Sequence, residues 1–170
     1  MKFDNHSRRL VMKATTVVFF MVVLILSSCS SAPEKPAAAP ELPPRIVQVN
    51  MIVSEQANPD VDGRPSPIVM RIYELKNLGK FEGGDFYQLF ENYDAQLGPE
   101  LIVSEQYHLK PGEVKKIKRT LSADTQYVAV SVAFRDLNQA IWKDSIRVTD
   151  DKSTDLLVLI EKLNTSIWKK

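Results

Sequence analysis

Apolar and polar residues alternate along most of the chain after residue 44, and this period of two predicts β-strands. Residues 46–53 place Val47, Val49, Met51 and Val53 on one face. Comparable runs occupy residues 68–73, 101–109, 114–121, 126–135, 140–148 and 154–162. Residues 165–168 are a candidate for one more short strand. Turn residues separate the runs, so we expect many short strands in one domain.

One segment follows a helical period instead. Its apolar residues are spaced i, i+3, i+4, i+7 and i+11, at Phe86, Leu89, Phe90, Tyr93 and Leu97. Asp85 with Gln88 forms a capping-box pattern at the start, and Gly98-Pro99 supplies a stop signal. The pattern predicts one amphipathic helix over about residues 85–97.

Together these elements predict a mainly β domain with one inserted helix. Short strands at a spacing of about ten residues favour a two-sheet sandwich or a barrel. The helical stripe has to be buried somewhere, so we expect the helix to pack on an edge or an end of the sheets.

The first 28 residues have the pattern of an export signal. Basic residues precede an apolar stretch at 14–26, which is shorter than the roughly 17 to 25 residues that span a bilayer. The step Leu26-Ser27-Ser28-Cys29 then resembles a bacterial lipoprotein signal. This resemblance implies that residues 1–28 are a signal peptide, that Cys29 is lipidated and that Ser30, which is not aspartate, permits sorting to the outer membrane.

Residues 29–44 are rich in proline and alanine, and they contain too few apolar groups to form a core. They predict an extended tether, followed by a single domain at residues 45–170. The signal peptide holds four of the 22 basic and one of the 21 acidic residues, which leaves 18 against 20. A chain this close to neutral has no basic field for nucleic acid, so we expect no nucleic-acid partner.

Residues suited to catalysis or cofactor binding are scarce. His108 is the one histidine beyond the signal peptide, Cys29 is the only cysteine, and no glycine-rich phosphate loop occurs. We therefore expect no enzyme activity, no cofactor, no metal and no small-molecule substrate.

The segment between the first two strands begins like a calcium-binding loop. Asn58, Asp60, Asp62 and Gly63 occupy positions one, three, five and six of the EF-hand pattern. The twelfth position is Val69, where a bidentate glutamate is required, so a turn-rich surface loop is the favoured interpretation.

The same segment, residues 57–67, carries three prolines, a glycine and Arg64 between two apolar strands. A loop stiffened by proline loses little entropy on docking, and arginine is frequent at binding hot spots. On these grounds alone a recognition surface and a tight structural bend remain equally open.

Several short motifs in this order resemble the type VI secretion lipoprotein family TssJ, also called VasD or SciN. They are the lipobox, Asn58-Pro59-Asp60, Gly63-Arg64-Pro65-Ser66-Pro67, Arg71-Ile72-Tyr73-Glu74-Leu75, Phe81, Asp85-Phe86-Tyr87-Gln88-Leu89, Leu109-Lys110-Pro111-Gly112, Ala133-Phe134-Arg135-Asp136 and Trp142. Two departures, Gly84 for a frequent alanine and Phe134 for a frequent tyrosine, lie outside the loop.

The resemblance implies a transthyretin-like two-sheet sandwich anchored in the outer membrane and facing the periplasm. It also implies that the loop between the first two strands binds the periplasmic domain of the inner-membrane protein TssM. The loop residues so assigned are Ala57, Asn58, Pro59, Asp60, Val61, Asp62, Gly63, Arg64, Pro65 and Ser66.

Two other functions remain open at this stage. A pilotin or assembly chaperone would capture a partner strand on an exposed sheet edge. A ligand-binding envelope lipoprotein would use a pocket in the sandwich, and ligand would then raise its thermal stability.

Overall fold

The computed structural model describes residues 44–148 and 153–170, which lie in one compact unit, Leu42–Lys170. The signal peptide, the lipidation of Cys29 and all but the last residue of the expected tether lie outside the described residues. They therefore stay predictions.

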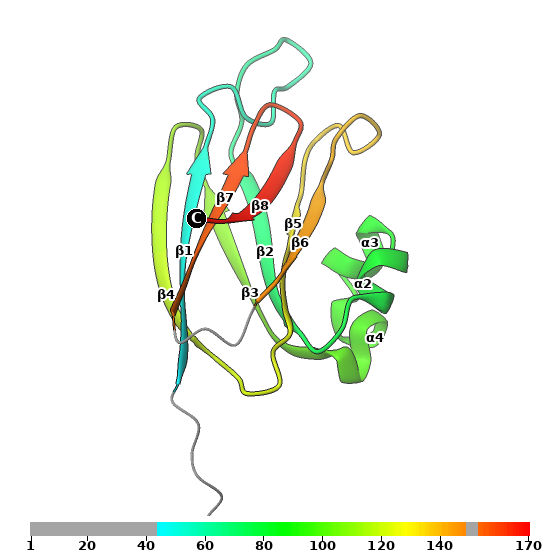
Figure 1. The fold of residues 1–170 in the computed structure, drawn as a ribbon. Coiled ribbons are helices and arrows are strands. Elements are labelled where there is room, and N and C mark those ends of the chain that lie inside the picture. The colour runs from blue at the N-terminus through cyan, green and yellow to red at the C-terminus, as the bar shows by residue number, and fades with distance from the viewer. Residues whose placement is uncertain (1–43, 149–152) are drawn as a thin grey trace, which may run out of the picture. The chain divides into compact units, whose positions relative to one another are not determined.

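Two four-stranded sheets pack face to face (Figure 1). The first, here the β1 sheet, has the order β4-β1-β7-β8, with β1 Arg45–Val53, β4 Val114–Leu121, β7 Ser153–Ile160 and β8 Thr165–Lys169. The second, the β2 sheet, has the order β3-β2-β5-β6, with β2 Ile68–Leu75, β3 Leu101–Leu109, β5 Tyr127–Val132 and β6 Lys143–Arg147. The mainly β sandwich is thus confirmed, and so is the short last strand.

The core lies between the sheets and follows the predicted alternation. Its largest contributions come from the inward residues of β1, β2 and β7, which are Val47, Val49, Met51, Ile68, Met70, Ile72, Leu156, Val158 and Ile160. β1 runs parallel to β7 and antiparallel to β4. Because β1 is the second strand of its sheet, it is paired along both sides.

The single helix expected at about 85–97 is instead two short helices, α3 and α4, with a further helix before them and a 3₁₀ turn after them. The structure has α2 Gly79–Gly83, α3 Phe86–Phe90, α4 Tyr93–Leu97 and a 3₁₀ turn, η2, Gly98–Glu100. The expected start is correct, since Asp85 Oδ1 accepts from the Gln88 N–H at 2.8 Å and Gln88 Oε1 accepts from the Asp85 N–H at 3.0 Å.

The helix breaks after Phe90 because two N–H groups converge on one carbonyl. Those of Glu91 and Asn92 both donate to Tyr87 O, at 3.0 and 3.2 Å, and Asn92 leaves the helical region with a ψ of 32°. The break sets the rings of Phe90 and Tyr93 on Arg71, whose guanidinium carbon lies 5.4 and 4.2 Å from their centroids. A guanidinium within about 6 Å of a ring centroid is attracted to the face of the ring, so both contacts hold the helices against β2.

The helices cover the outer face of the β2 sheet rather than an edge or an end. Tyr73, Leu75 and Ala129 point to that face and form a second buried cluster with Phe81, Leu89 and Leu97 of the helices. Strand β2 is therefore apolar on both faces, as expected where a sheet is covered twice. None of the helices in residues 44–148 and 153–170 has the length and hydropathy needed to cross a membrane.

Candidate partner-binding loop

Residues 54–67 connect β1 to β2 and lie at the end of the sandwich opposite Arg45 (Figure 1). Asn58 fixes the base of this loop. Its side chain is buried, Nδ2 donates to Pro67 O at 2.8 Å, and Oδ1 accepts from the Arg135 N–H at 2.8 Å. Its own N–H donates to Lys162 O at 3.0 Å. One asparagine thus ties the loop to the segments that follow β5 and β7.

Asn58 also sets the direction of the chain, because its φ is +52°. Asparagine tolerates this left-handed conformation better than other non-glycine residues do. A replacement such as alanine would remove two side-chain hydrogen bonds and strain the backbone at the same residue.

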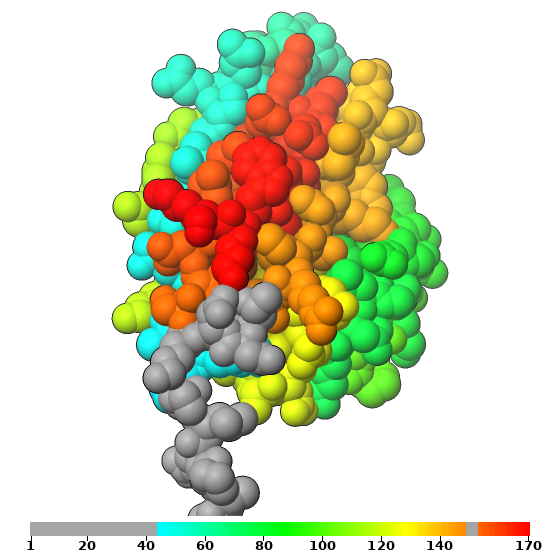
Figure 2. Space-filling view, in the orientation of Figure 1, coloured from blue at the N-terminus to red at the C-terminus, as the bar shows by residue number. Residues whose placement is uncertain are grey.

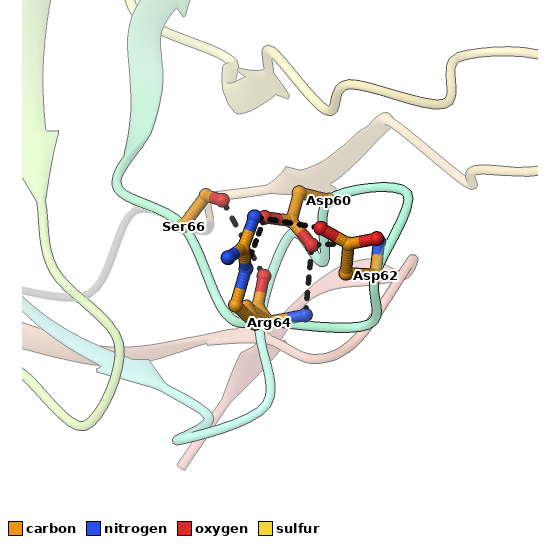
Figure 3. A network of polar contacts seen from close by, with 4 residues as sticks. All are labelled: Asp60, Asp62, Arg64 and Ser66. Atoms are coloured by element: carbon orange, nitrogen blue, oxygen red, sulfur yellow. Dashed lines mark hydrogen bonds and ion pairs between the residues drawn. The ribbon is translucent and has the colours of Figure 1, made fainter.

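The tip of the loop is a closed turn held by Asp60 (Figure 3). Asp60 Oδ1 accepts from the N–H groups of Asp62 and Arg64, each at 2.9 Å. The Asp60 N–H donates to Arg64 O at 2.9 Å, and the Gly63 N–H donates to Asp60 O at 3.0 Å. Gly63 has a φ of +80°, which glycine adopts without a steric penalty.

Arg64 closes the turn with two ion pairs. Its Nε lies 2.8 Å from Asp60 Oδ2, and its Nη2 lies 2.8 Å from Asp62 Oδ2. The N–H of Arg64 is the main cause that holds the pKa of Asp60 below its usual value of 3.8. Desolvation, the second-largest effect, opposes it, and the Arg64 guanidinium, the Asp62 N–H and the charge of Arg135 lower the pKa further. Exposed pairs contribute little stability singly. Here they act together with backbone hydrogen bonds and give the turn one conformation.

The ten residues assigned to binding divide into a buried base and an exposed tip. Ala57 is fully buried and Asn58 nearly so, and their side chains are therefore not available to contact a partner. Val61, in contrast, is fully exposed at the tip. The other members, Pro59, Asp60, Asp62, Gly63, Arg64, Pro65 and Ser66, are exposed or partly exposed. The part of the loop whose side chains are accessible to a partner is thus residues 59–66, on a base formed by residues 57 and 58.

The calcium-like pattern in this loop has a structural explanation. Both carboxylate oxygens of Asp60 and Oδ2 of Asp62 already accept hydrogen bonds or ion pairs from the Asp62 N–H and Arg64. In residues 44–148 and 153–170 no group of three or more His, Cys, Asp or Glu side chains is arranged to hold a metal ion. The pattern therefore reflects a turn whose carboxylates accept hydrogen bonds from the turn itself, where a calcium-binding loop would hold a cation.

The candidate chemistry at His108 gains no support from its surroundings. His108 is exposed on β3, and its Nε2 lies 3.2 Å from Gln106 Nε2. Among the described residues no carboxylate is hydrogen-bonded to its ring, so the pairing that orients a catalytic histidine is not present there.

Three features of this site were not predicted from the sequence. The roles of Arg135 and Lys162 rest on backbone groups, which carry no sequence signal. Asn58 itself had a local signal, the Asn-Pro step that marks turns. Its burial could not be inferred from that step, because it depends on the segments after β5 and β7.

Comparisons with known proteins agree with the fold. Residues 45–163 match the family described as Type VI secretion lipoprotein, VasD, EvfM, TssJ, VC_A0113. No protein with a curated description matches the chain.

Several solved structures share the fold. The lipoprotein TssJ1 from Pseudomonas aeruginosa is 29% identical with a TM-score of 0.73, and the match covers 75% of this chain and 98% of that one. Serratia marcescens Lip, described as a membrane-bound component of the type VI secretion system, is 20% identical with a TM-score of 0.70, over 76% and 100% of the two chains. A structure described as the TssM C-terminal domain from EAEC matches at 19% identity and a TM-score of 0.60, over 73% and 98%.

The family match covers most of the chain and ends within the last strand-to-strand turn, and the two-sheet fold agrees with that of TssJ1. The chain belongs to the TssJ (VasD) family of type VI secretion lipoproteins.

Proposed function

We propose that this chain is an outer-membrane lipoprotein of the type VI secretion trans-envelope complex and that residues 57–66 bind the periplasmic domain of TssM. The observation that carries the proposal is the position of the loop. Strand β1 begins at Arg45, where the chain enters the domain, and ends at Val53, where the loop begins. At roughly 3.3 Å per residue these points are about 26 Å apart. The chain therefore enters the domain at the end opposite the loop.

The state of the loop supports a binding role. It is held in one conformation by Asn58, Asp60 and Arg64, while Val61 and Arg64 remain exposed. A preformed loop loses little entropy when a partner binds it, so more of the contact energy appears as affinity. Two membrane-attached partners also meet at a raised effective concentration, which allows a modest affinity to suffice.

Binding rather than catalysis is the function these residues favour. His108 lies beside Gln106 and has no hydrogen-bonded carboxylate among the described residues. Membership of the TssJ family also points to a structural part of secretion machinery. We accordingly infer a non-enzymatic protein that uses no cofactor.

Capture of a partner strand on a sheet edge is less well supported on the β6 and β8 side. Asp144 Oδ2 of β6 accepts from the Ile167 N–H of β8 at 2.8 Å, and Ile141 forms a parallel bridge with Asn164. These contacts join the two sheets at that edge. An incoming strand would have to displace them.

Titration calorimetry tests the proposal. The chain from residue 29 with Cys29→Ser, which keeps the whole compact unit, is titrated with the TssM periplasmic domain of the same organism. Deletion of residues 60–64 should abolish binding without changing the melting curve, because the Asn58 anchor lies outside the deletion. Asp94→Ala, exposed on α4 and remote from the loop, is the control that should bind normally. Normal binding by the deletion would place the interface elsewhere.

The anchor is tested separately by fractionation. Cys29→Ser in the full chain should prevent fatty-acid labelling and outer-membrane sorting while leaving the domain folded. Retention of the label would contradict lipidation at Cys29.

A further inference from the structure

The outward face of the β1 sheet changes from polar to apolar along its strands. Residues that alternate with core positions point outward. Towards the Arg45 end these residues are Ile46, Gln48, Lys118, Thr120, Ser153 and Asp155, and towards the loop end they are Asn50, Ile52, Val114, Lys116, Leu157, Leu159, Ser166 and Trp168. The five apolar members of the second group are here called the outer-face patch: Ile52, Val114, Leu157, Leu159 and Trp168.

The patch is continuous across all four strands. Ile52 is paired with Val114 on one side and with Leu159 on the other, and Leu157 is paired with Trp168. Paired residues on neighbouring strands lie close enough to form one surface. Exposure reaches 38% at Ile52, 59% at Val114 and 50% at Trp168. Figure 2 shows this sheet with β7 and β8 in the foreground and the loop above them.

The patch also adjoins the candidate loop. Ile52 precedes Val53, the last residue of β1, and the next residue, Ser54, donates its N–H to Ile160 O of β7 at 2.8 Å. On the other side, the Gly112 N–H donates to Val53 O at 3.1 Å, two residues before Val114. These bonds join the first residues of the loop to the strands that carry the patch.

The loop alone is too small for a specific interface. Stable complexes bury about 800 Å² on each partner, from roughly 20 to 30 residues. Of the ten loop residues, the side chains of Ala57 and Asn58 are buried, which leaves residues 59–66. A partner that binds the loop therefore needs further surface next to it, and apolar groups with an exposed tryptophan are what the centre of an interface requires.

We propose that the partner that binds the loop also packs apolar side chains on the outer-face patch, with Trp168 of the edge strand β8 as the largest exposed contact. This inference rests on the proposed function and names the second half of the same interface. The partner surface opposite the patch is apolar, and it continues from the groups that receive the Asp60–Arg64 turn.

Paired charge substitutions test the proposal in the chain from residue 29 with Cys29→Ser. Ile52→Lys with Leu159→Lys places two cations in the patch, whereas Gln48→Lys with Thr120→Lys places two cations on the polar half of the same sheet. The first should weaken binding to the TssM periplasmic domain at least tenfold by calorimetry, because an apolar contact cannot solvate them. The Gln48→Lys and Thr120→Lys pair should change the affinity less than twofold. Trp168→Ala, the milder variant, should also weaken binding about tenfold.

The outcomes separate the two proposals. Loss of binding in the loop deletion, with normal binding in the folded patch variants, would overturn this inference and leave the loop proposal intact. Loss in the patch variants alone would support the patch and contradict the loop. Failure of the unaltered chain to bind TssM would overturn both. Melting temperatures within about 2 °C of the parent would show that lost binding is not lost folding.

Discussion

Arg119 and Glu74 form an ion pair that joins the two sheets from the inside. Arg119 Nη2 of β4 lies 3.1 Å from Glu74 Oε1 of β2, and the two side chains are only 12% and 4% exposed. Glu74 Oε2 also accepts from Thr125 Oγ1 at 2.9 Å, and Arg119 Nη1 lies 2.9 Å from Glu105 Oε2 of β3. Because β4 belongs to the β1 sheet while β2 and β3 belong to the β2 sheet, this network fixes the packing of one sheet against the other.

Arg119→Met should destabilise the domain by about 3 to 5 kcal/mol, because it leaves Glu74 buried without a cation. Urea denaturation followed by circular dichroism measures the change. Adding Glu74→Leu to the first substitution should restore much of the loss, since no unpaired charge then remains in the interior.

An exposed ion pair provides the control. Lys76 Nζ lies 3.1 Å from Asp124 Oδ2, with side chains 48% and 65% exposed. Lys76→Met should cost less than about 1 kcal/mol. Equal losses in Arg119→Met and Lys76→Met would show that the buried network does not stabilise the sandwich.

Tyr73 connects the helices to the β2 sheet through a buried hydroxyl. The hydroxyl donates to Leu89 O of α3 and lies 2.8 Å from Ser131 Oγ of β5. Burial, opposed in part by the hydrogen bond to Ser131, raises the pKa of Tyr73 from 10.0 to about 12. The fold thus favours the neutral phenol.

The stability that Tyr73 contributes should therefore be complete below pH 10 and disappear as the pH rises towards about 12. A pKa that is higher by two in the folded protein corresponds to about 3 kcal/mol in the free energy of unfolding. Tyr73→Phe should cost about 1 to 3 kcal/mol at pH 7, through the unpaired partners, but lose less stability between pH 10 and 12. Urea denaturation at several pH values measures both effects. Parallel pH profiles for the two proteins would refute this assignment, since Tyr107, whose pKa is also raised to about 12, is present in both.

Lys143 of β6 closes the end of α2. Its Nζ donates to Phe81 O at 3.0 Å and to Glu82 O and Gly84 O at 2.8 Å each. The cation is partly desolvated, and the pKa of Lys143 is lowered for that reason, against opposing effects of Glu82 and Asp85. A cation at a helix C-terminus satisfies carbonyls that have no partner within the helix.

Lys143→Met keeps the apolar stem and removes the three hydrogen bonds. We expect a loss of about 1 to 3 kcal/mol, with faster amide exchange confined to residues 79–90. Hydrogen exchange followed separately for each peptide measures the change in amide exchange. Lys80→Met, on the exposed side of α2, is the matched control and should leave exchange unchanged. A uniform rise across both sheets in Lys143→Met would show a global effect instead of a local one.

The strands could be predicted because alternation is a local signal. The eight strands lie where the pattern placed them, and the largest differences are at β5 and β6, which were expected at 126–135 and 140–148. There the apolar pattern continues into Phe134 and Trp142, which pack in the core without belonging to a strand. Burial and strand pairing produce the same pattern, and the sequence alone does not separate them.

The interruption of the helix had no local sequence signal as strong as the alternation that marks the strands. The stripe from Phe86 to Leu97 is continuous at helical spacing, and each member is buried or partly buried. The break brings the rings of Phe90 and Tyr93 against Arg71, a residue of β2. Such a contact follows from the tertiary structure and overrides helix propensity.

The candidate loop was located from its composition, but its internal structure was not. The prolines and the glycine predicted a stiff loop. In the structure its conformation is held mainly by the hydrogen bonds of Asn58 and Asp60. Asn58 acts through backbone groups of Lys162 and Arg135, more than 70 residues away in the sequence. The parallel pairing of β1 with β7 could not be predicted either, because alternation does not identify which strands are neighbours.

The last prediction concerns the charge of Asp60. Hydrogen bonds to its carboxylate lower its pKa, so the turn gains stability from the ionised form, and this gain is complete above the usual value of 3.8. It is lost as the pH falls through the lower pKa of the folded loop. The amide resonances of Asp62 and Arg64 should therefore shift together in one transition below pH 3.8, which NMR titration of the labelled chain measures. Asp60→Asn should abolish that transition and weaken TssM binding, because the amide cannot hold Arg64 as an ion pair. Independent titration of the two amides would show that Asp60 does not organise the turn.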